Sequence, residues 1–181
     1  MHEIISKPVE SVDIESIHQI KGYDTIKNGY PDYLTDESKL SAGEVELLAF
    51  PANEKELATI VKDVRAKGLT LTIAGARTGL VGGCVPDGGA LISLEKMNQA
   101  THLYYAEQAD EWRVIAQAGL LLSDLDTMIC EKRFPGMNES PDSSLADNLT
   151  RFSKDPASYF YPPDPTEMSA TIGGTVATNA S

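Results

Sequence analysis

Hydrophobic positions early in the chain switch from a strand pattern to a helix pattern and back. The stretch EVELLAFP at 44–51 is a short apolar run that ends at a proline, which predicts a buried strand. The next apolar residues recur at the i, i+3, i+4 and i+7 positions of one helical face, and they are Leu57, Ile60, Val61 and Val64. Residues 69–73, LTLTI, then alternate apolar residues with threonine, as a strand does. The order strand, helix, strand predicts a βαβ unit with parallel strands.

The predicted helix carries signals at both of its ends. Asn53 can cap the first turn, and Glu56 can reach back to it from three residues further on. Gly68 stands where a left-handed residue commonly ends a helix. We therefore expect the helix to begin after Asn53 and to end before Gly68.

Further elements follow along the chain. Residues 90–94 read as a third strand, and THLYYAE and EWRVIAQ, at 101–107 and 111–117, read as a hairpin. The stretch SDLDTMICEK at 123–132 predicts a second helix with Ser123 in the N-cap position. The apolar face of that helix consists of Leu125, Met128 and Ile129.

Two segments are weakly patterned. Residues 1–43 are rich in turn residues and predict an irregular surface segment, with one short helix near 14–20. Residues 134–158 are polar and interrupted by prolines, with one helical turn through Leu145, Leu149 and Phe152. We interpret this second segment as a tolerated insertion; a lid or a partner surface are the alternatives.

Composition narrows the classes of partner. The 181 residues carry 27 acidic against 15 Lys and Arg side chains, and the resulting net charge of −12 opposes binding to nucleic acid or to an anionic membrane. The sequence shows no secretory leader and no apolar run long enough to cross a bilayer, so we expect a cytoplasmic protein. Cys84 and Cys130 lack a CxxC spacing and neighbouring histidines, which predicts two small buried thiols and no metal site.

A glycine-rich stretch follows the second strand. IAGARTGLVGG, residues 73–83, contains four glycines, a density that weakens any regular element. Successive N–H groups in such a turn can point into one concavity and bind an anion, and the missing Cβ atoms let the ligand approach closely. The stretch therefore predicts a phosphate-binding loop. By itself it leaves open the alternative of a tight connection between strands.

Two familiar phosphate-binding loops do not fit this stretch. A Walker A loop needs Lys and then Ser or Thr after its last glycine, where this chain has Cys84 and Val85. A Rossmann loop needs a helix that opens at its last glycine, but Pro86 and two more glycines lead into another strand. We expect the loop to meet phosphate without a helix dipole directly behind it.

A second run of small and hydroxyl residues occurs near the carboxy terminus. The ordered pair AGARTGLVGGCVP, at 74–86, and YPPDPTEMSATIGGTVATNAS, at 161–181, resembles the flavin-binding domain of FAD-linked oxidases related to vanillyl-alcohol oxidase and to murein-precursor reductase. Within that group the nearest likeness is to the D-lactate and glycolate type of 2-hydroxyacid dehydrogenases. The resemblance runs from about residue 45 to 181 and implies an α+β fold, a PCMH-type FAD-binding domain.

The resemblance also implies which residues hold the cofactor. In such proteins the first loop wraps the FAD pyrophosphate, which corresponds here to Gly75, Ala76, Arg77, Thr78, Gly79, Leu80, Gly82 and Gly83. Positions that line the pyrophosphate and the flavin edge correspond to Pro163, Asp164, Thr171, Ile172, Gly173, Gly174, Thr178 and Asn179.

Two of these assignments have alternatives. Relatives often have Gly or Asn in place of Arg77, whose guanidinium either pairs with phosphate or lies solvated at the rim of the loop. The hydroxyl residues of the second motif can instead be the exposed side of a strand, which we prefer for Thr175.

The resemblance implies reversibly bound FAD, because the first loop has no histidine of the kind that fixes flavin covalently in some relatives. We expect solvated or capping roles for the three histidines, His2, His18 and His102. No catalytic base can be assigned.

The implied organisation is an amino-terminal extension at 1–43, a first FAD-binding subdomain at 44–133, the insertion at 134–158, and the start of a second subdomain at 159–181. We expect the chain to be the amino-terminal piece of an enzyme that oxidises a small 2-hydroxy acid with a separate electron acceptor. By itself it is then expected to be inactive, to bind FAD weakly and to self-associate. The alternatives are a stand-alone nucleotide-binding or scaffolding module, or a flavoprotein with other chemistry, such as an alcohol oxidase or an alkyl-phosphate-transferring relative.

Overall fold

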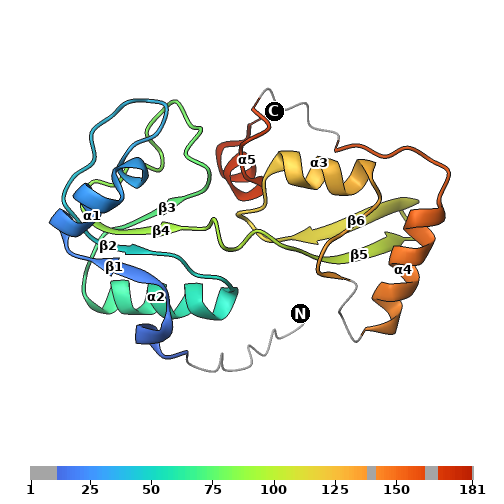
Figure 1. Cartoon of the computed structure of the whole chain (residues 1–181), viewed down its shortest axis with the longest axis horizontal. Coiled ribbons are helices and arrows are strands. Elements are labelled where there is room, and N and C mark those ends of the chain that lie inside the picture. Colours follow the sequence, from blue (N-terminus) through green and yellow to red (C-terminus); the bar gives the residue numbers. More distant parts are fainter. Residues whose placement is uncertain (1–11, 138–141, 162–166, 181) are drawn as a thin grey trace. The chain divides into compact units, whose positions relative to one another are not determined.

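The computed structural model describes residues 12–137, 142–161 and 167–180. These residues fall into two compact units (Figure 1). The first unit consists of the described residues of Met1–Ala74 and Gly79–Lys96, and the second of those of Gly75–Thr78 and Met97–Ser181. The division runs through the glycine-rich stretch, so each half of that stretch is described within its own unit.

The first unit is a four-stranded sheet with helices on both faces. Its elements in chain order are η1 (Ile14–Ser16), β1 (Gln19–Lys21), α1 (Tyr23–Gly29), η2 (Pro31–Leu34), β2 (Val45–Ala49), α2 (Glu54–Ala66), β3 (Leu71–Ala74) and β4 (Gly89–Ser93). The strand order is β1-β2-β4-β3. β4 pairs in parallel with both β2 and β3, and β1 is antiparallel to β2. The predicted βαβ unit and third strand are thus confirmed, with the third strand between the other two.

Successive side chains of the central strands enter two different cores. Leu47, Ala90 and Ile92 pack on the α2 face against Ile60 and Val64. Val45, Leu48 and Leu91 pack on the opposite face with Ile26 of α1 and with aromatic side chains of the segment that follows it. A parallel sheet needs apolar cover on both faces, and the amino-terminal segment supplies one of the two covers.

α2 begins and ends where its sequence signals predict. The Asn53 side chain accepts a hydrogen bond from the Glu56 N–H at 3.0 Å, and the Glu56 carboxylate accepts from the Ala52 N–H at 2.8 Å. Gly68, at the other end, has a φ of +68° in the left-handed region. Each of these helix caps involves only a few neighbouring residues, which is why the sequence alone places both ends correctly.

The prediction for the amino-terminal residues is wrong in its elements. Where one helix was expected near 14–20, the structure has the single turn η1 followed by the strand β1, and the helix α1 comes later. Ile20 pairs with Leu48 of β2, so β1 exists because β2 offers it a free edge. That pairing joins residues far apart in sequence, and no local pattern at 19–21 signals it.

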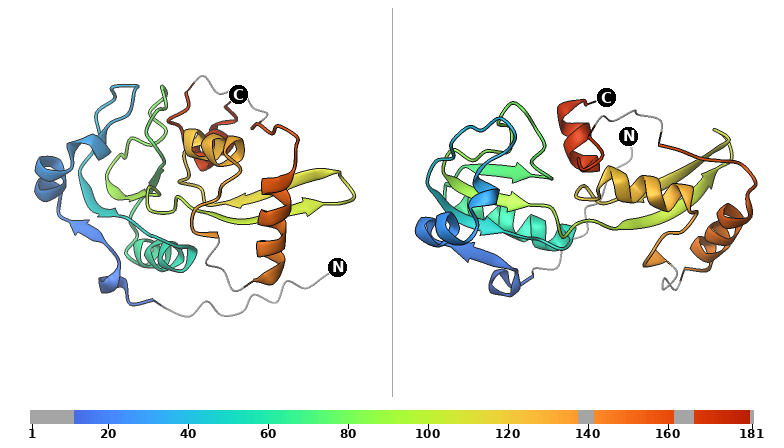
Figure 2. Two further views of the ribbon diagram at one scale, coloured as in Figure 1. Left: turned by 45° about the vertical axis from the view of Figure 1, so that its right-hand side comes forward. Right: turned by 45° about the horizontal axis from the view of Figure 1, so that its top comes forward.

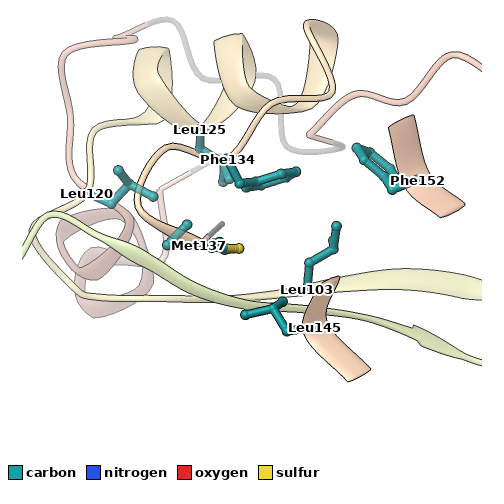
Figure 3. Close-up of a cluster of buried hydrophobic side chains, with 8 residues drawn as sticks. Leu103, Leu120, Leu125, Phe134, Met137, Leu145 and Phe152 are labelled. Carbon is teal, nitrogen blue, oxygen red and sulfur yellow. The ribbon is translucent and has the colours of Figure 1, made fainter. Parts of the chain in front are cut away.

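The described residues of the second unit form three helices that pack with a hairpin. Its elements are β5 (Ala100–Ala106), β6 (Glu111–Ala116), α3 (Leu122–Cys130), α4 (Ser143–Lys154) and α5 (Ile172–Thr178). β5 and β6 are antiparallel, which confirms the predicted hairpin. The core of the unit contains Leu103 of β5, Leu125 of α3 and Phe152 of α4 (Figure 3). Figure 2 shows α3 and α4 from two further directions.

α3 lacks the cap that its sequence suggests. Leu121, not Ser123, is the N-cap residue, and its side chain makes no capping hydrogen bond. The N–H groups of Leu122 and Ser123 donate instead to the carbonyls of Ala170 and Met168, at 2.9 and 3.0 Å. Backbone from the carboxy-terminal segment thus satisfies the first turn of α3, so a side-chain cap is not needed. The apolar face is as predicted, with Leu125 buried and Met128 and Ile129 half-buried against the core.

α4 is longer than the single turn expected from its sequence. Its twelve residues are capped by the Asp142 side chain, and Leu145 and Phe152 enter the core of the second unit. The pattern failed to predict the length because the apolar positions are few and widely spaced among polar ones. Whether 134–158 is an insertion relative to other proteins stays a prediction, but its helix is a core element of this unit.

Candidate functional site: the glycine loop and its two supports

The glycine loop is the connection from β3 to β4, residues 75–88. It contains no helix, as predicted, and it leaves the carboxyl end of a parallel strand, the place where ligands commonly bind in such sheets. Leu80 and Val81 at its tip are 76% and 81% exposed. Gly75, Ala76, Arg77 and Thr78 are half-buried in the second unit, and Gly79 and Gly83 are exposed in the first.

The beginning of the loop contacts the second motif. A Cβ atom on Gly75 would lie 2.3 Å from Oγ1 of Thr171, so only glycine fits there without displacing the threonine. Thr171 is 3% exposed, and its hydroxyl accepts a hydrogen bond from the Gly174 N–H at 3.1 Å. The structure therefore brings together two stretches that lie almost a hundred residues apart in the sequence.

The second motif forms the helix α5 and not a strand. Thr171 is its N-cap, and Asn179 ends it with a φ of +50°. Gly173 packs against the backbone of Ala118, where a Cβ atom would lie 2.8 Å from the carbonyl oxygen. The strand alternative, preferred above for Thr175, is wrong: the Thr175 hydroxyl donates to the Ile172 carbonyl within the helix. The two glycines hid the helix because they lower its intrinsic propensity.

The later part of the loop contacts the segment before β2. The Asp36 carboxylate is 3% exposed and accepts a hydrogen bond from the Ser38 N–H at 2.9 Å. The Cys84 thiol donates to the same carboxylate, with 3.6 Å between Sγ and Oδ2. A Cβ atom on Gly82, whose φ is +73°, would lie 2.4 Å from Cδ1 of Leu40. Sequence analysis missed Asp36 and Leu40, because nothing local connects them with the loop.

The surroundings of Asp36 keep it ionised. Burial pushes its pKa upward, but hydrogen bonds from the Ser38 hydroxyl and N–H, the Cys84 thiol and the Gly82 N–H together leave the pKa below its ordinary value. The largest of these lowering effects come from Ser38, the neighbour of Asp36 in the same turn.

Arg77 has the backbone conformation of a glycine. Its φ is +61°, in the left-handed region that non-glycine residues avoid. The guanidinium lies near its own loop, with Nη1 3.4 Å from the Gly75 carbonyl oxygen. This conformation makes Arg77 a strained residue.

Replacing Arg77 with glycine is expected to stabilise the protein by about 0.5–1 kcal/mol, because glycine adopts a positive φ without the steric cost. Urea unfolding of the wild type and of Arg77→Gly measures this difference. Arg65→Gly in the last turn of α2 is the control, and it should destabilise by about 1 kcal/mol. A loss of stability in Arg77→Gly would show that the side chain compensates for its strain.

The remaining predicted residues have varied outcomes. Pro163 and Asp164 lie outside the described residues, as does His2. His18 stacks on Phe50, with ring centroids 4.7 Å apart, and His102 is exposed on β5. The prediction of two buried thiols is wrong for Cys130, which is exposed at the end of α3, whereas Cys84 is half-buried.

The described part of the chain lacks two kinds of feature. No group of three or more His, Cys, Asp or Glu side chains in residues 12–137, 142–161 and 167–180 could hold a metal ion. None of the helices in those ranges has the length and apolar character needed to cross a bilayer.

Comparison with known proteins identifies the class. The family model described as "FAD binding domain" matches residues 45–145, more than half of the chain. The chain therefore belongs to this family of FAD-binding domains, and the expected cofactor, FAD, and the expected α+β fold agree with that membership.

The relatives include dehydrogenases. A D-lactate dehydrogenase of Anaerostipes hadrus is 36% identical over 151 residues, which cover 82% of this chain and 26% of the relative. A D-lactate dehydrogenase of Archaeoglobus fulgidus is 30% identical over 140 residues, covering 77% and 25%. The chain thus spans about a quarter of the length of these relatives.

Among solved structures, an alkyldihydroxyacetonephosphate synthase superposes with a TM-score of 0.55 at 16% identity, covering 94% of this chain and 32% of the synthase. This likeness concerns the fold alone.

Proposed function

We propose that this chain is the FAD-binding part of a flavin-dependent oxidoreductase that oxidises a small 2-hydroxy acid of the D-lactate or glycolate type. Membership of the family of FAD-binding domains supports FAD as the cofactor, and the two related D-lactate dehydrogenases support the substrate class. The electron acceptor, any self-association and a cytoplasmic location stay predictions.

The single observation of the structure that supports this function is the contact between the two motifs. The Thr171 hydroxyl can approach the backbone of residue 75 this closely only because that residue has no Cβ atom. A close approach of backbone to a buried hydroxyl, in a loop with exposed glycines, suits a ligand with many oxygen acceptors. The residues present therefore fit a pyrophosphate-containing cofactor.

The proposed roles follow from the position of each residue. The loop residues from Gly75 to Gly83 would donate backbone hydrogen bonds to the pyrophosphate. Gly82 would also act through its backbone conformation, with a φ of +73°. Thr171 would orient the start of α5, so that Ile172, Gly173, Gly174, Thr178 and Asn179 keep their places beside the cofactor. Pro163 and Asp164 keep the roles that the resemblance implies.

When bound, FAD would supply the hydride-accepting chemistry of the oxidation. The described residues contribute binding and orientation, and we assign no base among them. With no histidine in the loop to form a covalent link, we propose that FAD is bound reversibly.

The test uses protein expressed from the complete coding sequence. We expect visible flavin absorption, release of FAD into the supernatant on acid precipitation, and bleaching of the flavin by D-lactate or glycolate without oxygen. Apolar or non-hydroxylated acids of the same size, such as propionate, are the matched control and should leave the spectrum unchanged. A protein that stays colourless after incubation with FAD would contradict the cofactor, and a coloured protein that no 2-hydroxy acid bleaches would contradict the substrate class.

A further inference from the structure

We propose that Asp36 is a positioning residue for the cofactor: its buried carboxylate holds the later part of the glycine loop in the shape that binds FAD. This proposal rests on the proposed function and adds to it a residue outside the matched family segment, 45–145. Asp36 belongs to the segment that the sequence presents as an irregular extension. Figure 1 and Figure 2 show that segment and the loop side by side within the first unit.

The contacts of Asp36 join two turns of the chain. One carboxylate oxygen accepts from the N–H and the hydroxyl of Ser38, which fixes the local turn at 36–38. The other oxygen accepts from the Cys84 thiol and lies 3.8 Å from the position of a Cβ atom on Gly79. A single carboxylate thus links the segment before β2 to the chain after the tip of the loop through Cys84, and it lies near Gly79 before the tip.

Neighbouring contacts support the same part of the loop. Leu40 occupies the space that a side chain on Gly82 would need. The Gly43 N–H donates to the Pro86 carbonyl at 2.8 Å, so the segment continues along the loop as far as its end. Residues 36–43 therefore act as a support beneath 79–86.

The charge of Asp36 argues for a role in binding geometry. Burying a carboxylate is costly, and an apolar side chain would fill the same space with less loss of hydration. A negative charge close to a pyrophosphate site also opposes the ligand. In return, the carboxylate accepts the Cys84 thiol and so fixes the position of the chain that follows the tip of the loop.

The experiment measures FAD affinity in apo-protein prepared from the complete coding sequence, by quenching of flavin fluorescence. Asp36→Asn keeps the size of the side chain but replaces one accepting carboxylate oxygen with an NH₂ group. This donor would face the other donors around residue 36. We expect the dissociation constant for FAD to rise roughly 10-fold to 100-fold, the factor that corresponds to one or two lost charge-assisted hydrogen bonds. Glu37→Gln removes the same charge from the next, exposed residue and should change the constant less than about 2-fold.

A second pair of variants leaves Asp36 in place. Cys84→Ala removes the donor to Asp36 and is expected to weaken FAD binding, whereas Cys84→Ser restores a donor and should return the affinity toward that of the wild type. In the Cys84→Ala background, Asp36→Asn should weaken binding by a smaller factor than it does alone. This rescue and this coupling in affinity would not arise from a general loss of stability, which a thermal melt without FAD measures separately.

The outcomes separate the two proposals. Wild-type affinity in Asp36→Asn, or additive effects of Asp36→Asn and Cys84→Ala, would overturn the positioning role while the proposed function stands. If Asp36→Asn does not fold, equal affinities of Cys84→Ala and Cys84→Ser overturn the role just as clearly. A wild-type protein that binds no FAD overturns the proposed function, and this proposal with it.

Discussion

Gly75→Ala is expected to destabilise the protein by about 2–3 kcal/mol and to weaken FAD binding strongly. The new Cβ atom would lie 2.3 Å from Oγ1 of Thr171, a separation that no packed structure accommodates. Thr171 is buried and short, so it relieves the clash only by rotating its hydroxyl away from the Gly174 N–H. The cost combines overpacking with the loss of a helix cap. Urea unfolding and FAD titration measure the two effects.

Gly83→Ala is the matched control for this prediction. It lies in the same loop, and nothing stands within 4 Å of the position of its Cβ atom. We expect a change in stability within about 0.5 kcal/mol of the wild type. The double variant Gly75→Ala with Thr171→Ala should lose less than the sum of the single variants, because the second change removes the clashing atom. Equal effects of the two glycine substitutions would show that the contact with Thr171 has no energetic importance.

Phe152→Ala is expected to have the largest effect on stability, a loss of about 3–5 kcal/mol in the second unit. Phe152 is 2% exposed, and its ring centroid lies 5.0 Å from that of Trp112 and 5.2 Å from that of Tyr159. Truncation would leave a cavity among aromatic rings that have little freedom to collapse into it. Trp112 is the single tryptophan of the chain, so its fluorescence reports the unfolding of this unit in urea.

Asp147→Ala, an exposed position on the same helix, is the control and should change stability by less than about 0.5 kcal/mol. The comparison also tests the interpretation of 134–158 as a tolerated insertion. A loss below about 1 kcal/mol in Phe152→Ala would mean that α4 is an appendage whose removal the unit tolerates. A loss in the expected range would make α4 part of the folding unit, whether or not 134–158 is an insertion relative to other proteins.

The sequence predicted those elements whose signals are local. The helix α2 carries its own apolar face and both of its caps, and the hairpin of β5 and β6 carries alternation within each strand. The strand β1 was missed because three residues become a strand only when β2 offers a partner edge. The prediction that Ser123 caps α3 was wrong for a related reason. Backbone carbonyls of residues 168 and 170 accept hydrogen bonds from the first turn of α3, and the sequence near 123 contains no pattern that predicts such contacts.

The candidate site likewise has some features that the sequence could predict and others that it could not. The glycines of the loop could be recognised as a ligand-binding stretch, because density of glycine is itself a signal. The contact of Gly75 with Thr171 could be inferred only through a family resemblance. The support from Asp36 could not be predicted, since an aspartate in a turn-rich segment has many ordinary roles, and 48 residues separate it from Cys84.

The assignment of Gly75–Thr78 to the second unit, while the residues on either side belong to the first, has a practical consequence for cloning. No single cut in the gene separates the units, because a product that starts at Met97 lacks a tetrapeptide of its own unit and exposes the buried hydroxyl of Thr171. Anyone who wishes to study the second unit in isolation should supply residues 75–78 as a synthetic peptide or graft them through a designed linker.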